Sequence, residues 1–158
     1  MRIGIGYDIH RLEEGRTMVL GGVTIPCSKG PDGHSDGDVL IHAVCDAVLG
    51  AIGKGDIGCM FPDTDMAHKG RASIEFLKEV TLVMERAGYS ICNIDCIIIT
   101  ETPKIALYSE QIKHVIGKVM KIDKDIISVK GKTSEKLGDI GREEAIAAHA
   151  AVLIEKKR

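Results

Sequence analysis

Segments with the two-residue period of β-strands alternate with segments of helical period along almost all of the 158 residues. Strands are predicted at residues 2–7, 18–20, 23–25, 89–100 and 126–130. Helices are predicted at residues 38–52, 71–87, 104–121 and 142–156, and glycine-rich loops at residues 28–37, 53–70 and 131–141. This order predicts one layer of sheet covered by helices, an α/β or α+β two-layer fold. The length suits a single domain over residues 1–158.

The charged and aromatic residues exclude several classes of partner. Lys and Arg number 21 and Asp and Glu 23, which gives a net charge of −2, and only 3% of the residues are aromatic. Binding of nucleic acid needs a basic surface or aromatic stacking platforms, so no nucleic acid is expected. No apolar run reaches the roughly 18 residues of a membrane-spanning helix, and the first residues carry no targeting pattern. We therefore expect a cytoplasmic protein without membrane contact, whose 5 cysteines are reduced.

Two glycine-containing segments look like nucleotide-binding motifs without meeting their requirements. Gly4-Ile5-Gly6 lacks the third glycine of a dinucleotide fingerprint, because Ile9 occupies that position, and no helix follows. Gly131-Lys132-Thr133 resembles the end of a P-loop, but Ile126 occupies the position of the leading glycine. A loop of this composition can still hold a phosphate through backbone N–H groups and hydroxyls.

A candidate metal site involves the end of the first strand. Asp8 and His10 are predicted to share one face of that strand, because side chains alternate along it. His42, among apolar neighbours in the predicted helix 38–52, is the best third candidate, and such a set suits Zn²⁺ with a fourth position open. Asp46, one helical turn beyond His42, is predicted to orient its imidazole. The alternative is that Asp-x-His is a common pattern and that a single helical histidine is a core or surface residue.

A second polar group, His34-Ser35-Asp36-Gly37-Asp38, stands where the helix 38–52 is predicted to begin. A helix N-terminus favours an anion, and Ser35 or Asp36 is predicted to cap the helix. A solvated loop with one capping residue is the alternative. Asp56-Ile57-Gly58 and Phe61-Pro62-Asp63-Thr64-Asp65 indicate turns and could also bind the hydroxyl groups of a sugar or polyol.

These segments occur with two others in an order and spacing that resembles one known family. The additional segments are Pro103-Lys104 and Thr133-Ser134-Glu135-Lys136-Leu137-Gly138. The complete set, which spans nearly the whole chain, is similar to the 2-C-methyl-D-erythritol 2,4-cyclodiphosphate synthases of the non-mevalonate isoprenoid pathway. The resemblance implies an α+β two-layer sandwich in which helices cover a mixed sheet. It also implies a homotrimer whose active sites are shared by neighbouring subunits.

The resemblance implies a role for each matching residue. Asp8, His10 and His42 would hold Zn²⁺ or another divalent cation, and Glu135 would bind a second cation, Mg²⁺ or Mn²⁺. The residues implied in catalysis are His34, Ser35, Asp38 and Thr133. The residues implied in substrate binding are Asp36, Asp56, Gly58, Phe61, Pro62, Asp63, Thr100, Pro103, Lys104, Ile105, Lys132, Ser134, Glu135 and Arg142.

The implied reaction forms 2-C-methyl-D-erythritol 2,4-cyclodiphosphate and CMP from 4-diphosphocytidyl-2-C-methyl-D-erythritol 2-phosphate. The 2-phosphate attacks the β-phosphate of the same molecule. Because this nucleophile is already an anion, the site needs charge neutralisation and alignment more than a strong base. The abundance of Asp agrees with metal use, since carboxylates beside a diphosphate would repel it without cations. The alternatives are a zinc-dependent phosphohydrolase acting on a related diphosphate with water as the nucleophile, and a trimeric metal-binding protein without catalysis.

Two positions differ from the pattern of many family members. Lys132 stands where many members have a threonine, and it adds charge near the expected diphosphate. Asp139 replaces an aromatic residue that lines a cavity on the trimer axis, where some members hold an isoprenoid diphosphate. We therefore expect an axial cavity, near Arg142 and Glu144, that is less apolar and binds isoprenoid diphosphates weakly.

Overall fold

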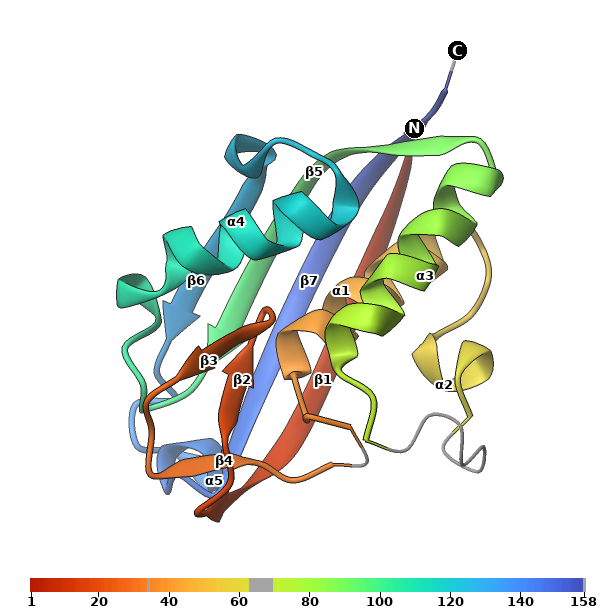
Figure 1. Cartoon of the computed structure of the whole chain (residues 1–158). Helices are drawn as coiled ribbons and strands as arrows, with labels where there is room; N and C mark the ends of the chain where they lie inside the picture. Colours follow the sequence, from red (N-terminus) through yellow and green to blue (C-terminus); the bar gives the residue numbers. More distant parts are fainter. Residues whose placement is uncertain (34, 63–69, 158) are drawn as a thin grey trace.

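The computed structural model describes residues 1–33, 35–62 and 70–157 (Figure 1). Its strands are β1 (Arg2–Glu14), β2 (Met18–Leu20), β3 (Val23–Ile25), β4 (Lys29–Pro31), β5 (Tyr89–Ile99), β6 (Ile127–Lys132) and β7 (Ala145–Lys156). Its α-helices are α1 (Val39–Ala51), α2 (Ile57–Met60), α3 (Ser73–Arg86), α4 (Ser109–Met120) and α5 (Gly138–Gly141). Short 3₁₀ helices are η2 (Ile105–Leu107) and η3 (Lys124–Ile126). None of the helices in these ranges is long and apolar enough to cross a membrane.

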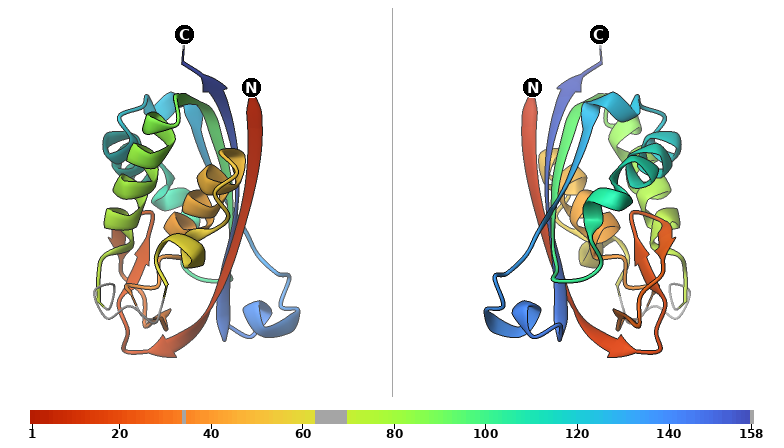
Figure 2. Two further views of the ribbon diagram at one scale, coloured as in Figure 1. Left: turned by 90° about the vertical axis from the view of Figure 1, so that its right-hand side faces the viewer. Right: turned by 90° about the vertical axis from the view of Figure 1, so that its left-hand side faces the viewer.

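A five-stranded sheet in the order β4-β1-β7-β5-β6 forms one layer of the fold. β5 and β6 pair in parallel, whereas the other neighbours pair antiparallel. α1, α3 and α4 cover one face of this sheet (Figure 2). β2 and β3 form the predicted hairpin, in which Gly21 and Gly22 adopt the positive φ angles of 60° and 76° that such a tight turn requires. The expected α+β arrangement, a mixed sheet covered by helices, is confirmed.

The prediction of a helix at residues 142–156 is wrong, because most of this segment is the strand β7. Its alanines favour a helix by intrinsic propensity, but β7 lies in the middle of the sheet between β1 and β5. Ala147 and Ala148 are both buried although consecutive strand residues point to opposite faces. The two-residue alternation that identifies a strand is therefore lost, as in other strands that are buried on both faces.

Other predicted boundaries also need correction. β1 continues well beyond residue 7, to Glu14, and pairs with β4 in a segment that was expected to be loop. The expected helix 104–121 is divided between η2 and α4. The expected loops 53–70 and 131–141 contain the one-turn helices α2 and α5. The elements that were not predicted, β4, η2, α2 and α5, have only three or four residues each, and periodicity carries little information over so few.

Two glycines of β1 allow α1 to approach the sheet closely. A Cβ atom at Gly4 would lie 1.8 Å from the carbonyl oxygen of Ala47, and one at Gly6 would lie 1.9 Å from that of Ala43. Any residue other than glycine would therefore push the helix away from the strand. The two glycines, which do not form a nucleotide motif, bring α1 onto the strand that carries Asp8.

The other side chains of β1 form an apolar surface. Ile3, Ile5, Tyr7 and Ile9 alternate with the residues that face α1, and all of them are exposed, Ile5 to 74%. Because Gly4 and Gly6 face α1, these side chains point to the opposite face of the sheet. α5 lies on that side of the sheet (Figure 2). A contiguous exposed apolar surface of this kind indicates contact with another protein surface.

Candidate active site

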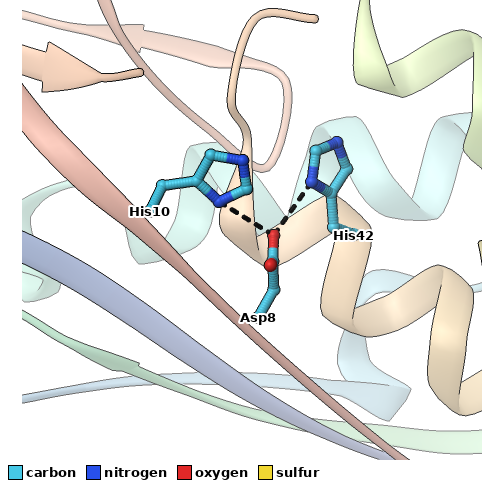
Figure 3. A group of neighbouring side chains, drawn as sticks. All are labelled: Asp8, His10 and His42. Atoms are coloured by element: carbon cyan, nitrogen blue, oxygen red, sulfur yellow. Dashed lines mark hydrogen bonds and ion pairs between the residues drawn. The ribbon is translucent and has the colours of Figure 1, made fainter. Parts of the chain in front are cut away.

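Asp8, His10 and His42 form a compact group at the centre of the candidate site (Figure 3). Asp8 and His10 lie on the face of β1 that is turned toward α1, and His42 comes from α1. The Asp8 Oδ2 atom lies 3.1 Å from His10 Nδ1 and 2.9 Å from His42 Nδ1. Strand alternation and the close approach of α1 together bring these residues into contact, as the sequence predicted.

The donor atoms of this group fit a divalent cation. His10 Nδ1 is buried and makes no aligned hydrogen bond, although it lies 3.1 Å from Asp8 Oδ2. The contact is short enough for an ion pair but lacks hydrogen-bond geometry, so a cation beside Asp8 would give this buried nitrogen a partner. One carboxylate oxygen and two imidazole nitrogens are ligands that Zn²⁺ accepts, and a three-residue set leaves a position for substrate or water.

The charges in this group support cation binding. Burial raises the pKa of Asp8, but its contacts and charge interactions with His10 and His42 outweigh this effect and hold the pKa below its usual value. Burial lowers the pKa of His42, but the hydrogen bond and charge of Asp8 raise it above its usual value, with smaller contributions from Asp38 and Asp36. An ionised carboxylate that stabilises positive charge on its neighbours also attracts a metal ion.

A network of hydroxyl and carboxylate groups extends from the far side of His42. The Ser73 hydroxyl lies 2.9 Å from His42 Nε2, and the Ser35 hydroxyl lies 3.4 Å from the same nitrogen. Asp36 accepts hydrogen bonds from the hydroxyl and from the backbone N–H of Ser73. The sequence analysis missed Ser73, although a serine at a predicted helix start is a typical capping signal. The neighbouring His34 lies outside the described residues.

Asp38 is fully buried and is the N-cap of α1, a place that was predicted for Ser35 or Asp36. Its carboxylate accepts hydrogen bonds from the backbone N–H groups of Gly21, Gly22 and Ile41, at 2.9, 2.7 and 3.1 Å. Burial raises the pKa of Asp38 to about 6, although these three hydrogen bonds oppose the shift. Asp38 therefore joins the β2–β3 hairpin to the start of α1 through these hydrogen bonds.

The acidic residues near α2 have local partners. Asp46 Oδ1 accepts a hydrogen bond from the backbone N–H of Ile57 at 2.8 Å, so Asp46 positions α2, whereas it was predicted to orient His42. Asp56 is the exposed N-cap of α2 and accepts from the N–H of Cys59 at 2.8 Å. Gly58 is exposed in the same helical turn. Asp56 and Gly58 therefore face solvent beside α1, with which α2 is in contact.

Beyond α2, the predicted substrate residues divide between core and surface. Phe61 is buried, and its ring centroid lies 4.7 Å from that of Phe76 in α3. Pro62 is exposed. Asp63 lies outside the described residues.

A second group of predicted residues lies where β5 and β6 end. The Thr100 N–H donates to the Lys132 carbonyl oxygen at 2.9 Å, which continues the pairing of the two strands. Ile105 is buried against Gly131, where an added Cβ would lie 2.7 Å from the Ile105 side chain. Pro103 is half-buried and Lys104 is exposed. Pro103 and Lys104 thus place one apolar and one cationic side chain beside the loop that follows β6.

This loop is held in place by Glu101, which the sequence analysis did not single out. Glu101 Oε1 accepts from the backbone N–H groups of Ser134 and Lys136 at 2.9 and 3.3 Å, and Oε2 lies 3.2 Å from Lys136 Nζ. Burial raises the pKa of Glu101, but these contacts outweigh it and lower the pKa. The Thr133 hydroxyl donates to Glu135 at 2.6 Å, and both side chains are exposed. No local pattern predicts Glu101, because its partners lie 33 and 35 residues away.

Arg142 follows α5, on the side of the sheet opposite α1, α3 and α4 (Figure 2). It pairs with Asp139 and with Glu144, the latter at 3.1 Å, and all three side chains are exposed. The residues expected around an axial cavity therefore form a polar cluster at the surface of the protomer.

The group of Asp8, His10 and His42 and the group where β5 and β6 end lie at the same end of the sheet but on different strands. Ile9 is the cross-strand neighbour of Ala147, Ala147 of Ile99, and Ile99 of Lys132. Ile9, between Asp8 and His10, and Lys132, beside Thr133, are thus three strand spacings apart, or about 14 Å. A single compact substrate site within one subunit would have to span this distance.

Comparisons with known proteins agree with this arrangement. A model of the YgbB family matches residues 1–155. The chain is 49% identical over 156 residues to the 2-C-methyl-D-erythritol 2,4-cyclodiphosphate synthase of Syntrophomonas wolfei subsp. wolfei, with 99% of each chain covered. It is similar to the structure of IspF from Plasmodium falciparum in complex with CDP, at a TM-score of 0.88 and 41% identity, covering 99% of this chain and 97% of that one. It is also similar to the bifunctional IspDF of Campylobacter jejuni, at a TM-score of 0.94 and 39% identity, where 98% of this chain covers 42% of the other. The sequence, the fold and the arrangement of the candidate site together establish that this chain belongs to the YgbB family.

Proposed function

We propose that this protein converts 4-diphosphocytidyl-2-C-methyl-D-erythritol 2-phosphate to 2-C-methyl-D-erythritol 2,4-cyclodiphosphate and CMP. The observation that carries the proposal is the convergence of Asp8, His10 and His42 on one point, in a chain whose full-length relatives are named as synthases of this product. In the reaction, an oxygen of the 2-phosphate forms a bond to the β-phosphorus while the bond from that phosphorus to the CMP oxygen breaks. No water is consumed, and CMP leaves with the negative charge.

The proposed role of the metal group, Asp8, His10 and His42, is to neutralise negative charge on the substrate phosphates. A divalent cation held by Asp8, His10 and His42, such as Zn²⁺, would withdraw charge from the phosphoryl group that is attacked. The imidazoles and the carboxylate fix the position of that charge, which is the main requirement when the nucleophile is already an anion. Glu135, exposed beside the Thr133 hydroxyl, is proposed to hold a second cation, Mg²⁺ or Mn²⁺, at the diphosphate.

The loop residues near α1 and α2 are proposed to bind the methylerythritol end of the substrate. Ser35 and Asp36 are half-buried next to His42, and Asp56 and Gly58 offer an exposed carboxylate and an accessible backbone. His34, Phe61, Pro62 and Asp63 are proposed to complete this end. Asp38 does not reach solvent, and its carboxylate is engaged by backbone N–H groups, so we assign it a positioning role for the loop.

The second group is proposed to bind the CMP end. Thr100, Pro103, Lys104 and Ile105 would hold the cytidine, while Lys132, Thr133 and Ser134 would bind the diphosphate. The IspF relative in complex with CDP supports a nucleotide at one of the sites of this fold. Holding both ends of one flexible substrate converts a rare encounter of two phosphates into a favoured one.

We propose that the active protein is a homotrimer in which each site is shared by two subunits. The separation of about 14 Å between the two groups within one chain supports shared sites. The exposed apolar residues Ile3, Ile5 and Ile9 supply a surface for association. Asp139 and Arg142 are proposed to lie near the trimer axis, where their charges make a pocket for an isoprenoid diphosphate less apolar.

The test is incubation of the zinc-loaded protein with 4-diphosphocytidyl-2-C-methyl-D-erythritol 2-phosphate and Mg²⁺, followed by phosphorus NMR. Equal amounts of CMP and cyclic diphosphate are expected. An Asp8→Asn variant should lose this activity, whereas Asp123→Asn, which changes an exposed carboxylate at the start of η3, should retain it. A linear phosphate with CMP would instead support the phosphohydrolase, and no turnover would contradict the proposed reaction.

A further inference from the structure

Ser73 connects the metal group to a carboxylate that is not one of its proposed ligands. It is the first residue of α3, is fully buried, and lies between Asp36 and His42. Its hydroxyl oxygen lies 2.9 Å from His42 Nε2, and its hydroxyl donates to Asp36 Oδ1. Its backbone N–H donates to Asp36 Oδ2 at 3.1 Å. The N-cap residue of α3, Ala72, has no side-chain capping group, so Asp36 satisfies this helix end from another part of the chain.

The direction of each hydrogen bond follows from counting hydrogens. A carboxylate only accepts, and a serine hydroxyl has one hydrogen and two lone pairs. Because Asp36 takes the hydroxyl hydrogen of Ser73, the Ser73 oxygen can only accept from His42. His42 Nε2 must therefore carry a hydrogen, which it donates to Ser73 Oγ.

The nitrogen at the other side of the imidazole is then the one left for a cation. In the metal-free structure His42 Nδ1 lies 2.9 Å from Asp8 Oδ2 and forms a hydrogen bond with it, and because a carboxylate only accepts, Nδ1–H is the donor. Since Ser73 keeps the hydrogen on Nε2, Nδ1 is the nitrogen that gives up its hydrogen when a cation binds, which leaves its lone pair facing the ligand group. Ser35 lies farther from His42 Nε2, at 3.4 Å against 2.9 Å, so Ser73 is the closer acceptor.

We propose that Ser73 is a positioning residue of the metal centre, which fixes the tautomer and the ring orientation of His42 and presents Nδ1 to the cation. Asp36 in turn orients the Ser73 hydroxyl. Partners of this kind on the second nitrogen of a ligating histidine contribute to metal affinity. The inference rests on the metal site of the proposed function, but it concerns binding and can be tested without substrate.

The first test compares zinc dissociation constants, measured by competition with a chelating dye. Ser73→Ala should weaken zinc binding about 10- to 100-fold, and Ser73→Thr, which keeps a hydroxyl, should restore most of it. Thr81→Ala is the matched control, because Thr81 is a buried residue of the same helix whose hydroxyl donates to the Leu77 carbonyl oxygen and not to the metal group. An unchanged affinity in Ser73→Ala, or an equal loss in Thr81→Ala, would overturn the proposal.

The second test reads the tautomer directly from ¹⁵N–¹H NMR spectra of the histidine side chains, with His42 assigned by His42→Gln. The zinc-loaded wild-type protein should show the hydrogen of His42 on Nε2 and none on Nδ1, and Ser73→Ala should shift the Nε2 resonance because the acceptor of its hydrogen bond is removed. A hydrogen on Nδ1 with zinc bound would overturn the proposal. A zinc-binding protein with the expected tautomer and no synthase activity would contradict the proposed function alone and leave the role of Ser73 standing.

Discussion

Gly6→Ala tests directly how the packing of α1 on β1 builds the metal centre. The added Cβ would lie 1.9 Å from the carbonyl oxygen of Ala43 and 2.9 Å from the backbone nitrogen of Ala47. Carbon and oxygen atoms approach only to about 3.3 Å, so the helix must withdraw by about 1 Å or more. This movement separates His42 from Asp8, whose contact distance is 2.9 Å.

The expected loss of stability follows from two opposing effects. Overpacking of a core typically lowers the free energy of unfolding by about 1–3 kcal/mol. A clash with helix backbone should cost about 3 kcal/mol, because the backbone cannot rotate away as a side chain can. Replacing glycine restricts the unfolded chain and returns about 0.4–1 kcal/mol. We therefore expect a net loss of about 2 kcal/mol in the free energy of unfolding.

Gly50→Ala is the matched control, because Gly50 lies in α1 and an added Cβ there would meet no atom within 4 Å. It should stabilise the helix by about 0.5–1 kcal/mol. Urea unfolding at one fixed protein concentration, necessary if the protein is a trimer, should separate the two variants by about 1 M in midpoint. If Gly6→Ala matches Gly50→Ala in stability, or binds zinc as tightly as the wild-type protein, the packing argument is refuted.

Three further predictions concern the acidic residues and the shared site. The pKa of Asp38 is raised from 3.8 to about 6, so its contribution to stability is fully present below pH 3.8 and is lost as the pH rises through 6. The stability of the wild-type protein relative to Asp38→Asn should therefore fall by about 2 kcal/mol between pH 4 and 7, and urea unfolding that shows no such change would contradict it. Glu101→Ala should lower kcat/KM by about 10- to 100-fold by displacing the loop at Ser134, with a smaller effect in Glu101→Gln; unchanged kinetics in both would argue against this role. Mixing Asp8→Ala and Lys104→Ala subunits should restore part of the activity, and no recovery after verified subunit exchange would count against shared sites.

The sequence predicts those parts of the site whose geometry is local. Alternation along a strand places Asp8 and His10 on one face, and the helical period places His42 on an apolar helix. Their meeting was a hypothesis that the structure bears out, because Gly4 and Gly6 let the helix approach. The hairpin turn at residues 21–22 is also local and was predicted from its glycines.

The parts that were missed depend on partners far away in the sequence. Ser73 meets Asp36 across 37 residues, and Asp38 reaches the N–H groups of the hairpin across 16 and 17 residues. A carboxylate among polar neighbours predicts a cap or a ligand equally well until its partners are known. The strand β7 was missed for a related reason, since its central place in the sheet removes the alternation that would identify it.

Strand β1 combines packing, the candidate cation ligands and an apolar outer surface through its two-residue period. On its inner face Gly4 and Gly6 admit α1, and the next two inner positions, Asp8 and His10, lie where that helix presents His42. The outer positions, such as Ile5, are apolar and exposed. A shift of register by one residue would exchange the two faces. It would place isoleucines against the helix backbone and remove both ligands from His42. The group of Asp8, His10 and His42 can therefore form only in the register that also closes the core, which would link the proposed metal binding to the folding of the sheet.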